Sequence, residues 1–396
     1  MAAAGRSEAR LRAAVAACGA PSVPVGVIVA DTADPASLSA MASRSRLLVN
    51  AVGPYAPGGV GVRVAAACVA AGCDYLDVSG EPLYLETAEA ELHDRARDAG
   101  VLVVTSCGFD SVPADLGAQF AAAAFRARHG AGAVLSRVDS YLSSRGPVHG
   151  HFATYESAVN GVASAPALRR LRRAAGRPPL APPGPRPAVP ARPTWDERLG
   201  AWVAPFPGSD ASVVRRTQQR LLADGAAPFH YTAAFLLYRR ASVIKYTVLG
   251  SLAMALAPYR AGRRLLLALP RVFTAGHFSR AGPSDAEMAR AGFRMEIRAS
   301  GWAGGGDRAG PARGAGAAAG GGAPDREVRV AVSGPEMGYV ATPIIVGEAA
   351  LTVLAERAGI TRRVGPGGVF TPAPPLFATA GYIERLRAAG VTFDEL

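Results

Sequence analysis

The sequence is poor in cysteine and has no long apolar run at its start. Its 396 residues include four cysteines, which form neither a C-x-x-C pair nor a Cys/His metal spacing. That pattern excludes a disulfide scaffold and a zinc module, so we expect a reducing compartment and no metal site. The first residues lack the apolar stretch of a signal peptide, which predicts an intracellular protein that is not secreted. The cysteines are Cys18, Cys68, Cys73 and Cys107.

Lysine is also scarce, although the chain is strongly basic. The formal net charge is +12, and such a charge is typical of proteins that bind nucleic acids or anionic membranes. Only Lys245 is a lysine among the 43 basic residues, and no recognition motif for nucleic acid accompanies the charge. We therefore expect no nucleic-acid partner.

Apolar runs alternate with helical patterns through the first third of the chain. They predict strands near residues 25–30, 47–52, 74–78 and 101–105, and helices near 7–18, 34–38, 62–71, 82–99 and from 113 onward. The strands are apolar throughout rather than alternating, which is typical of a parallel sheet covered by helices on both faces. The sequence therefore predicts a doubly wound α/β domain over residues 1–133.

This alternation ends after residue 134, where a second α+β domain is expected over residues 134–335. Residues 293–299 and 327–332 alternate like antiparallel strands, joined by a Gly-rich loop at 301–324. The remaining expected features are a strand at 134–142, a surface excursion with arginines at 166–173 and a proline-rich stretch at 178–193, a helix capped by Ser209 or Asp210, a strand at 229–237 and an amphipathic helix at 340–354.

An apolar stretch at 246–257 is followed by arginines, and two interpretations of residues 246–271 stay open. The stretch is too short to cross a bilayer, which takes about 20 residues. It predicts either a buried helix or a monotopic element that enters one leaflet of a membrane or the surface of a lipid droplet. In the second case the arginines would meet anionic headgroups.

Five turn phrases resemble those of the saccharopine dehydrogenase-like oxidoreductases in order and spacing. They are VNAVGPY at 49–55, DVSGEP at 77–82, SCGFDSVPADLG at 106–117, GSDASVVRRT at 208–217 and GYVATP at 338–343. The resemblance runs from about Gly5 to GGVFTP at 367–372 and is closest to the eukaryotic type. It implies a Rossmann-like domain for a nicotinamide dinucleotide, a second domain for substrate or a homodimer contact, and a segment at 336–396 that packs back on the core.

One part of the family's pattern has no counterpart in this sequence. Family members begin with a strand and a Gly-rich turn, then a helix and a second strand that ends in Ala-Gly-Arg, whereas this sequence starts at Ala4-Gly5-Arg6. The resemblance therefore implies a Rossmann sheet with its first strand missing, unpaired neighbouring strand edges and no main anion site for the pyrophosphate. Either the natural protein begins upstream of Met1, which we favour, or the chain is a variant that does not bind the dinucleotide.

The resemblance places cofactor contacts at the ends of the strands. Arg6 follows a strand beside the adenosine ribose, where a guanidinium suits a 2′-phosphate, so NADP(H) is favoured over NAD(H). An ordinary solvated arginine is the alternative for Arg6, and helix capping is the alternative for Asp31. The expected cofactor-binding residues are Gly5, Arg6, Ser7, Asp31, Gly53, Pro54, Tyr55 and Gly80.

Three candidates for the proton donor or a substrate contact come from loops after successive strands. Tyr55, Glu81 and Asp110 all lie at carboxyl ends of strands, where doubly wound sheets bind ligands. We therefore expect them to converge near the nicotinamide. For Asp110 and Asp115 the alternative is capping of the following helix.

Other reactive side chains are expected to be structural. Cys107 has no neighbouring histidine in the sequence, so packing is expected rather than nucleophilic chemistry. His149 and His151 form an H-x-H pair without a third ligand, which favours a loop or pocket role over a metal site. A group after Gly208 is expected to shape a helix, with binding of an anionic group as the alternative; it comprises Ser209, Asp210, Arg215 and Arg216.

Two classes of function follow from the sequence. The first is an NADP-dependent oxidoreductase that acts on a lipid or other hydrophobic substrate in lipid or glycolipid metabolism, since bacterial trans-acting enoyl reductases share the first three phrases. The second is a non-catalytic scaffold protein of a membrane or lipid droplet, built on a degenerate dehydrogenase fold. Both predict a membrane surface or lipid droplet as the location, with the mitochondrion as a further candidate.

Overall fold

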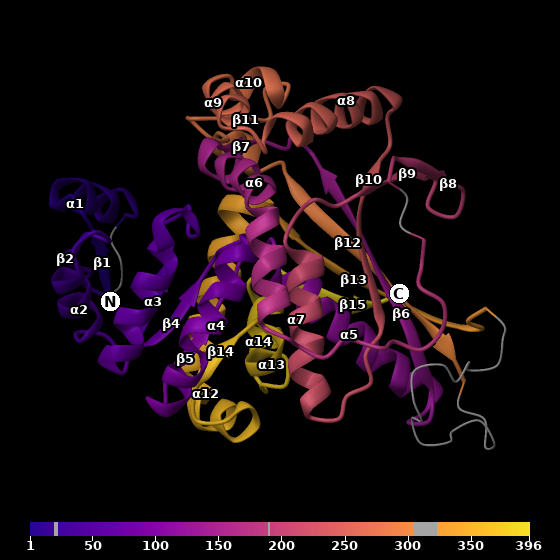
Figure 1. Cartoon of the computed structure of the whole chain (residues 1–396), viewed down its shortest axis with the longest axis horizontal. Coiled ribbons are helices and arrows are strands. Elements are labelled where there is room, and N and C mark those ends of the chain that lie inside the picture. Colours follow the sequence, from indigo (N-terminus) through magenta and orange to yellow (C-terminus); the bar gives the residue numbers. More distant parts are fainter. Residues whose placement is uncertain (20–22, 189–190, 304–322) are drawn as a thin grey trace.

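The computed structural model of the chain (Figure 1) describes residues 1–19, 23–188, 191–303 and 323–396. Its strands form a two-stranded, a four-stranded and a seven-stranded sheet, and a short pair of strands, β7 (Gly150–His151) and β11 (Phe278–Ser279). The two all-parallel sheets of the first half lie on the left of Figure 1, and the seven-stranded sheet lies on the right.

A four-stranded parallel sheet forms the centre of the first half. Its order is β14 (Gly368–Phe370), β5 (Leu102–Val104), β4 (Asp74–Asp77) and β3 (Leu47–Asn50). After β3 come the short turn η1 (Pro57–Gly59) and α3 (Val60–Ala71); α4 (Pro82–Asp98) and α5 (Val112–His129) follow β4 and β5. β5 is buried along its whole length, because its side chains are apolar and helices cover the sheet. The predicted parallel α/β class is confirmed.

The first two strands form a separate parallel sheet. β1 (Ala2–Gly5) pairs with β2 (Gly26–Val29), and α1 (Glu8–Ala17) and α2 (Pro35–Ala42) accompany them at the left end of Figure 1. Within the described ranges, β1 has β2 as its one ladder partner and β3 has β4, so an edge of each strand stays unpaired. Val29 and Val49 are 55% and 41% exposed. The apolar strands β2 and β3 are therefore partly exposed, although their sequences are typical of covered strands.

The seven-stranded sheet has the order β15, β13, β12, β6, β10, β9, β8. Its members are β6 (Val134–Arg145), β8 (Thr194–Asp196), β9 (Ala201–Pro205), β10 (His230–Leu237), β12 (Gly292–Trp302), β13 (Arg326–Pro335) and β15 (Thr392–Glu395). β6 and β10 run parallel, whereas β12 pairs antiparallel with β6 and β13. α5 packs closely on this sheet, since a Cβ at Gly117 would lie 2.4 Å from Ile297. The expected β12–β13 hairpin is present, but 304–322 of its loop lie outside the described residues.

The surface excursion expected near residues 166–173 is wrong. Those residues belong to α6 (Phe152–Ala174), a long helix with Pro166 inside it. Of its four arginines in this stretch, Arg172 pairs with Glu86 of α4 and donates to Ser212 of α7 (Asp210–Ala223), whereas Arg169, Arg170 and Arg173 are exposed, as expected of a solvated stretch. The proline-rich stretch contains no helix or strand in its described part, 178–188 and 191–193.

A helical layer lies at the top of Figure 1. It consists of α8 (Arg240–Leu256), α9 (Arg260–Ala268) and α10 (Pro270–Phe273), and a short α11 (Asp285–Met288) follows. No residue of α8 is buried, so the expectation of a buried helix at 246–257 is wrong. The inner side of the layer packs on α6 through a small cluster that includes Tyr155 and Leu266.

The C-terminal segment contributes a strand to each of the two larger sheets, β14 to the first and β15 to the second. A π-helical turn at Met337–Ala341 leads into α12 (Thr342–Val364), and α13 (Ala373–Leu376) and α14 (Tyr382–Ala388) follow. The helical stretch Met337–Val364 is long and apolar enough to cross a membrane. However, Ile345, Val353 and Ile360 belong to the main hydrophobic core, as in the core helix of a globular protein.

Candidate functional site

The loops after β3, β4 and β5 meet at the carboxyl edge of the four-stranded sheet. Glu81, in the loop after β4, is buried and joins two of these loops. Its Oε1 accepts hydrogen bonds from the backbone N–H of Tyr55 at 2.9 Å and from the hydroxyl of Ser157 at 3.0 Å, and its Oε2 accepts one from the N–H of Ala56 at 3.0 Å. The carboxylate of Glu81 therefore holds the loop that carries Gly53 and the cis peptide bond before Pro54.

Tyr55 is also used within the protein. Its hydroxyl donates to the carbonyl oxygen of Asn50 at 2.8 Å, and its ring stacks on Tyr84 with centroids 5.2 Å apart. Burial and the nearby charge of Asp77 raise the pKa of Tyr55. The structure thus brings Tyr55 and Glu81 together, as expected, but it engages both of their polar groups in holding loops.

Asp77 is a buried acid at this edge that the sequence analysis did not single out. Its carboxylate accepts hydrogen bonds from the N–H groups of Ser79 and Ser106 at 3.0 and 2.8 Å and from the hydroxyl of Tyr84 at 2.6 Å. Burial raises its pKa to about 6, although these hydrogen bonds oppose the shift. Ser106 has a φ of 63°, which is unusual for a residue with a side chain. Asp77 therefore fixes the loops after β4 and β5 relative to each other.

Asp110 lies where three segments converge. A Cβ at Gly80 would lie 2.2 Å from its Oδ2, and a Cβ at Gly208 would lie 2.7 Å from its Oδ1, so glycine at both positions makes room for this carboxylate. The hydroxyl of Ser209 donates to the backbone oxygen of Asp110 at 2.7 Å and lies 3.3 Å from its Oδ2. Burial raises the pKa of Asp110 to about 7, and the bonds from Ser209 oppose the shift. Asp110 is therefore partly protonated near neutral pH.

Further acids surround Asp110. Burial and the charge of Asp110 raise the pKa of Asp210, and burial raises that of Asp115 to about 6. Asp115 accepts a hydrogen bond from the N–H of Ala373 at 2.8 Å. The capping role considered for Asp110 and Asp115 is wrong, since Ser111 occupies the N-cap position of α5. Ser209 occupies the N-cap position of α7, but its side chain bonds to Asp110 instead of capping.

The residues expected at the adenosine end lie at the carboxyl ends of β1 and β2. Arg6 is exposed directly after Gly5, and the hydroxyl of Ser7 caps α1 by accepting from the N–H of Arg10 at 3.4 Å. Asp31 accepts from the N–H of Ala33, whereas the N-cap of α2 is a different residue, Asp34. The helix-capping alternative for Asp31 is therefore wrong.

These two groups of residues suit opposite ends of a dinucleotide. Arg6 is an exposed cation directly after β1, and Gly53 leaves the loop after β3 without a side chain at its position. The 2′-phosphate and the nicotinamide of NADP(H) require these two features. The residues present therefore fit the two ends of the cofactor.

The surroundings of three other reactive side chains, Cys107, His149 and His151, indicate structural roles. Burial raises the pKa of the Cys107 thiol, which leaves it unsuited to nucleophilic attack. His149 pairs with Glu287 at 2.8 Å, and the ring of His151 accepts a hydrogen bond from the N–H of Ala153. Across the residues that the structure describes, no group of three His, Cys, Asp or Glu side chains could hold a metal ion.

A groove of about 1110 Å³ is connected to the loop of Asp110 through one of its lining residues, Phe293, which contacts Phe109. Phe293 and Ile344 line it, and Phe109 packs edge-on against Phe293 with ring centroids 4.7 Å apart. The N–H of Phe109 donates to the hydroxyl of Thr342, at the start of α12, at 3.1 Å. Thr342 and Ser157 belong to segments far from the Rossmann-like part, so sequence reasoning missed their role in positioning the site.

The comparisons with known proteins agree with this geometry. Residues 1–104 match the family described as the saccharopine dehydrogenase NADP binding domain. A probable mitochondrial saccharopine dehydrogenase-like oxidoreductase of Arabidopsis thaliana is 35% identical over 100% of this chain and 88% of its own length. The saccharopine dehydrogenase-like oxidoreductase of Homo sapiens is 34% identical over 99% of this chain and 88% of its own.

Two further comparisons concern a more distant relative and a solved structure. A lipid droplet localized protein of Caenorhabditis elegans is 32% identical over 99% of this chain and 90% of its own. The apo saccharopine dehydrogenase (L-Glu forming) of Saccharomyces cerevisiae shares the fold with a TM-score of 0.52 and 13% identity, over 100% of this chain and 94% of that one. Together with the geometry, these similarities establish that the chain belongs to the saccharopine dehydrogenase-like oxidoreductases, a family of NAD(P)-dependent enzymes with an NADP-binding domain.

Proposed function

We propose that this protein reduces a hydrophobic substrate with NADPH and that Asp110 supplies the proton. The observation that carries the proposal is the carboxyl group of Asp110, which lies between Gly80 and Gly208 with a pKa of about 7. A general acid works best when its pKa is near the working pH. The other two candidates, Tyr55 and Glu81, already use their polar groups to hold loops.

The cofactor would lie across the carboxyl edges of the two parallel sheets. Gly5, Arg6, Ser7 and Asp31 would bind the adenosine end, and Gly53, Pro54, Tyr55 and Gly80 would border the nicotinamide end. When bound, the cofactor supplies a hydride to an electrophilic carbon of the substrate. The proton that completes the reduction would come from Asp110, which regains it from solvent. Arg6 favours NADP(H), with NAD(H) as the weaker alternative.

A hydrophobic substrate is supported by the groove beside Phe109. Its volume of about 1110 Å³ exceeds the range of about 300–1000 Å³ that is usual for small-ligand pockets, so it accommodates a long chain. Phe293 lies in its wall and contacts Phe109, which precedes Asp110. Within this proposal residues 1–133 bind the cofactor, residues 134–335 bind the substrate and a second copy of the chain, and residues 336–396 join the two.

The helical layer α8–α10 would hold the protein at a lipid surface. Ile244, Val248 and Leu252 follow one side of α8 and are 64%, 52% and 43% exposed. Residues 225–284 contain no Asp or Glu, while the layer carries seven basic residues, namely Arg239, Arg240, Lys245, Arg260, Arg263, Arg264 and Arg271. Exposed apolar side chains ringed by cations suit the surface of an anionic membrane or a lipid droplet.

The names of two relatives support locations for this chain. The relative from Caenorhabditis elegans is named for lipid droplets and the relative from Arabidopsis thaliana for mitochondria. We favour a lipid droplet or membrane surface inside the cell, because the surface of α8–α10 suits it directly. The mitochondrion is the second candidate.

NADPH consumption with substrates presented in vesicles tests the proposal. Long-chain aldehydes, ketones and enoyl compounds in vesicles should be reduced, and their short-chain, water-soluble analogues should be reduced far more slowly. The proposal fails if no long-chain compound is consumed, or if short-chain analogues react equally well.

A non-catalytic scaffold is the second candidate function. It is favoured by the separation of β1–β2 from the four-stranded sheet, because a divided Rossmann sheet weakens the cofactor site. The two functions predict different binding. A scaffold would bind vesicles but not NADPH, whereas the oxidoreductase would bind both.

A further inference from the structure

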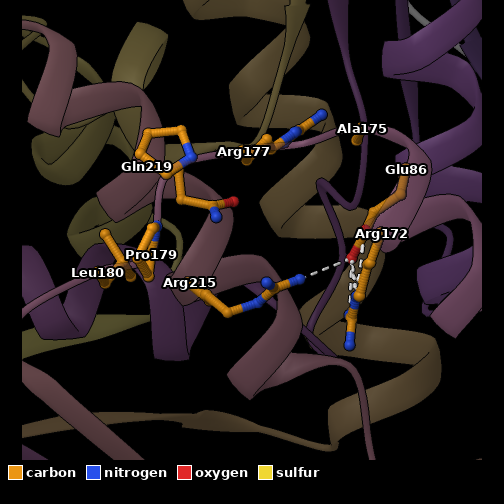
Figure 2. A pocket seen from close by; sticks show the side chains of 9 residues that line it. Glu86, Arg172, Ala175, Arg177, Pro179, Leu180, Arg215 and Gln219 are labelled. Carbon is orange, nitrogen blue, oxygen red and sulfur yellow. Dashed lines mark hydrogen bonds and ion pairs between the residues drawn. The ribbon is translucent and has the colours of Figure 1, made fainter.

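A second cavity lies away from the carboxyl edge, where α4, α6 and α7 meet. It measures about 270 Å³, and arginines dominate its polar lining. Arg172 ends α6, Arg177 lies in the loop that follows, and Arg215 comes from α7, while Glu86 comes from α4. Figure 2 shows the guanidinium groups of Arg172 and Arg215 meeting at the carboxylate of Glu86.

The charges around this cavity do not balance. Oε1 of Glu86 accepts from Arg172 at 2.6 Å and from Arg215 at 3.0 Å. One other acid, Glu89, pairs with both Arg177 and Arg216. Four arginines therefore share two carboxylates among these residues, which leaves a net charge of +2.

Several donors around the cavity are also unused. Within the described ranges, Arg177 and Arg215 each donate a single hydrogen bond, through Nη2. Arg216, behind them, is buried, and its Nε and Nη1 have no partner. Burial and the neighbouring charge of Arg172 lower the pKa of Arg215, and burial lowers that of Arg216 to about 10. Each of these cations is less stable here than in water, and an added anion would reverse that effect.

A purely structural network would be built differently. Ion pairs that only join helices gain most when their charges balance and side chains fill the space between them. Here the space stays open, and two charges are in excess. Guanidinium groups arranged as a fork match the oxygens of phosphate in geometry and charge. The remaining wall consists of the amide side chain of Gln219 and an apolar part, formed by Ala175 and residues 178–180, that suits a short organic group.

We propose that this cavity, the arginine cavity, binds a phosphoryl dianion, either free phosphate or the phosphate of a small monoester. Its two negative charges would offset the net charge of +2 that these four arginines and two glutamates carry. The volume is below the usual range of about 300–1000 Å³ for drug-sized ligands, which restricts the ligand to a small molecule. Because α4 follows β4, whereas α6 and α7 belong to the second half of the chain, the bound anion would join the two halves. This site does not depend on the proposed reduction reaction.

Calorimetric titration of the full chain with inorganic phosphate, at constant ionic strength set with chloride, tests the proposal. We expect saturable binding with one site per chain. Arg215→Gln and, separately, Arg177→Gln should each weaken it by about tenfold or more, because a hydrogen bond to a charged group contributes that much. The matched control is Arg220→Gln, which removes the same charge from an exposed position of α7 that pairs with Asp224. It should change the affinity by less than about twofold.

A second arm separates the sources of the phosphoryl group. Glycerol phosphate in solution should compete with inorganic phosphate, and it should do so equally well whether or not phosphatidic acid vesicles are present. If the site takes a lipid headgroup instead, Arg215→Gln should weaken vesicle binding while free phosphate binds neither protein. That outcome would overturn the proposal of a small soluble ligand.

Three results overturn the proposal outright. The first is the absence of saturable phosphate binding by the folded wild-type protein, which needs no variant. The second is an equal effect of Arg215→Gln and Arg220→Gln, which would indicate only general attraction to a basic surface. The third is unchanged affinity in Arg177→Gln when that variant is folded. None of these readouts requires turnover, so failure here and failure of the reductase proposal are distinguishable.

Discussion

Carboxylates lie inside the molecule at the carboxyl ends of β4 and β5, whereas apolar side chains lie outside on α8. The carboxylates of Asp77 and Asp110 are removed from solvent, whereas the apolar side chains of Ile244 and Leu252 are exposed to it. Folding by itself favours solvated carboxylates and buried apolar side chains. The acids inside are fixed by glycines and hydrogen bonds, and the apolar side chains outside belong to a segment that carries basic residues but no Asp or Glu. This difference is the basis of our two proposals, a site for chemistry in the first region and a surface for attachment in the second.

The largest expected effect concerns the first region. Asp110→Asn keeps the shape of the side chain but removes its proton, so turnover of a vesicle-bound substrate should fall by about 100-fold or more. NADPH affinity, measured by fluorescence titration, should stay within about twofold. Asp115→Asn is the control, because Asp115 is a neighbouring buried acid whose carboxylate accepts a hydrogen bond from Ala373. Equal losses of turnover in both variants would remove the distinction between Asp110 and the acids around it.

The next effect concerns the outer region. Ile244→Asp with Leu252→Asp should weaken binding to anionic vesicles by about 100-fold or more, since each apolar side chain contributes about 1.5–3 kcal/mol on leaving water. Thermal stability should hardly change, because neither side chain is buried. Leu351→Asp is the matched control, since Leu351 is 50% exposed on α12 but far from the layer in sequence. Unchanged flotation of the double variant would mean that α8 does not contact lipid.

A smaller effect tests the packing around Asp110. Gly80→Ala would place a Cβ 2.2 Å from Oδ2 of Asp110, so the carboxylate or the loop must move. We expect a loss of about 1–3 kcal/mol in the free energy of unfolding, measured in urea. At Gly161, in α6, a Cβ would meet nothing within 4 Å, so Gly161→Ala should be neutral or stabilising. Equal stability of both variants would contradict the close packing around Asp110.

The last prediction concerns the pH dependence of stability. The folded-state pKa of Asp110 is about 7 and those of Asp77 and Asp115 are about 6, all above the value of about 3.9 in an unfolded chain. Between about pH 4 and pH 7 the folded state therefore holds protons that the unfolded state has lost. The free energy of unfolding should fall as pH rises through this window, by up to about 1.4 kcal/mol per pH unit for each proton.

The variant Asp110→Asn measures how much Asp110 contributes to this pH dependence. In this variant the free energy of unfolding, measured in urea, should no longer fall between about pH 6 and pH 7, while the fall due to Asp77 and Asp115 stays.

Glu86 has the opposite pH dependence. Burial alone would raise the pKa of Glu86, but the hydrogen bond and charge of Arg172 and the charges of Arg216 and Arg215 lower it. That acid therefore contributes stability that is lost as pH falls below about 4.5. A wild-type curve that rises with pH from 5 to 7 would contradict the buried acids.

Much of the first half could be predicted from the sequence, because local pattern and final environment agree there. The apolar run at 101–105 forms the buried β5, and the periodic run at 82–99 forms α4. The loops after these strands then meet at one edge, as parallel topology requires. The position of Asp110 at this edge was predicted for that reason.

The rest depends on contacts that no local pattern encodes. α8 and α12 are both apolar, yet α12 packs in the main core while α8 has no buried residue. Composition cannot separate them, because burial is decided by which elements pack alongside. In the same way the sequence does not distinguish Arg172, which pairs with Glu86 of α4, from the exposed Arg169, Arg170 and Arg173 beside it. Ser209 was expected to cap a helix, but the hydroxyl faces Asp110 across the fold.

The central claim is that the carboxyl edges of the parallel sheets hold NADP(H), and nucleotide binding tests it most directly. Fluorescence titrations with NADPH and NADH would compare the wild-type protein, Arg6→Ala and the control Arg10→Ala, which removes an exposed arginine from the next turn of α1. We predict saturable NADPH binding that Arg6→Ala weakens by about tenfold, with NADH binding and the control unchanged. No saturable binding by the folded wild-type protein, or an equal loss for both nucleotides in Arg6→Ala, would contradict the account.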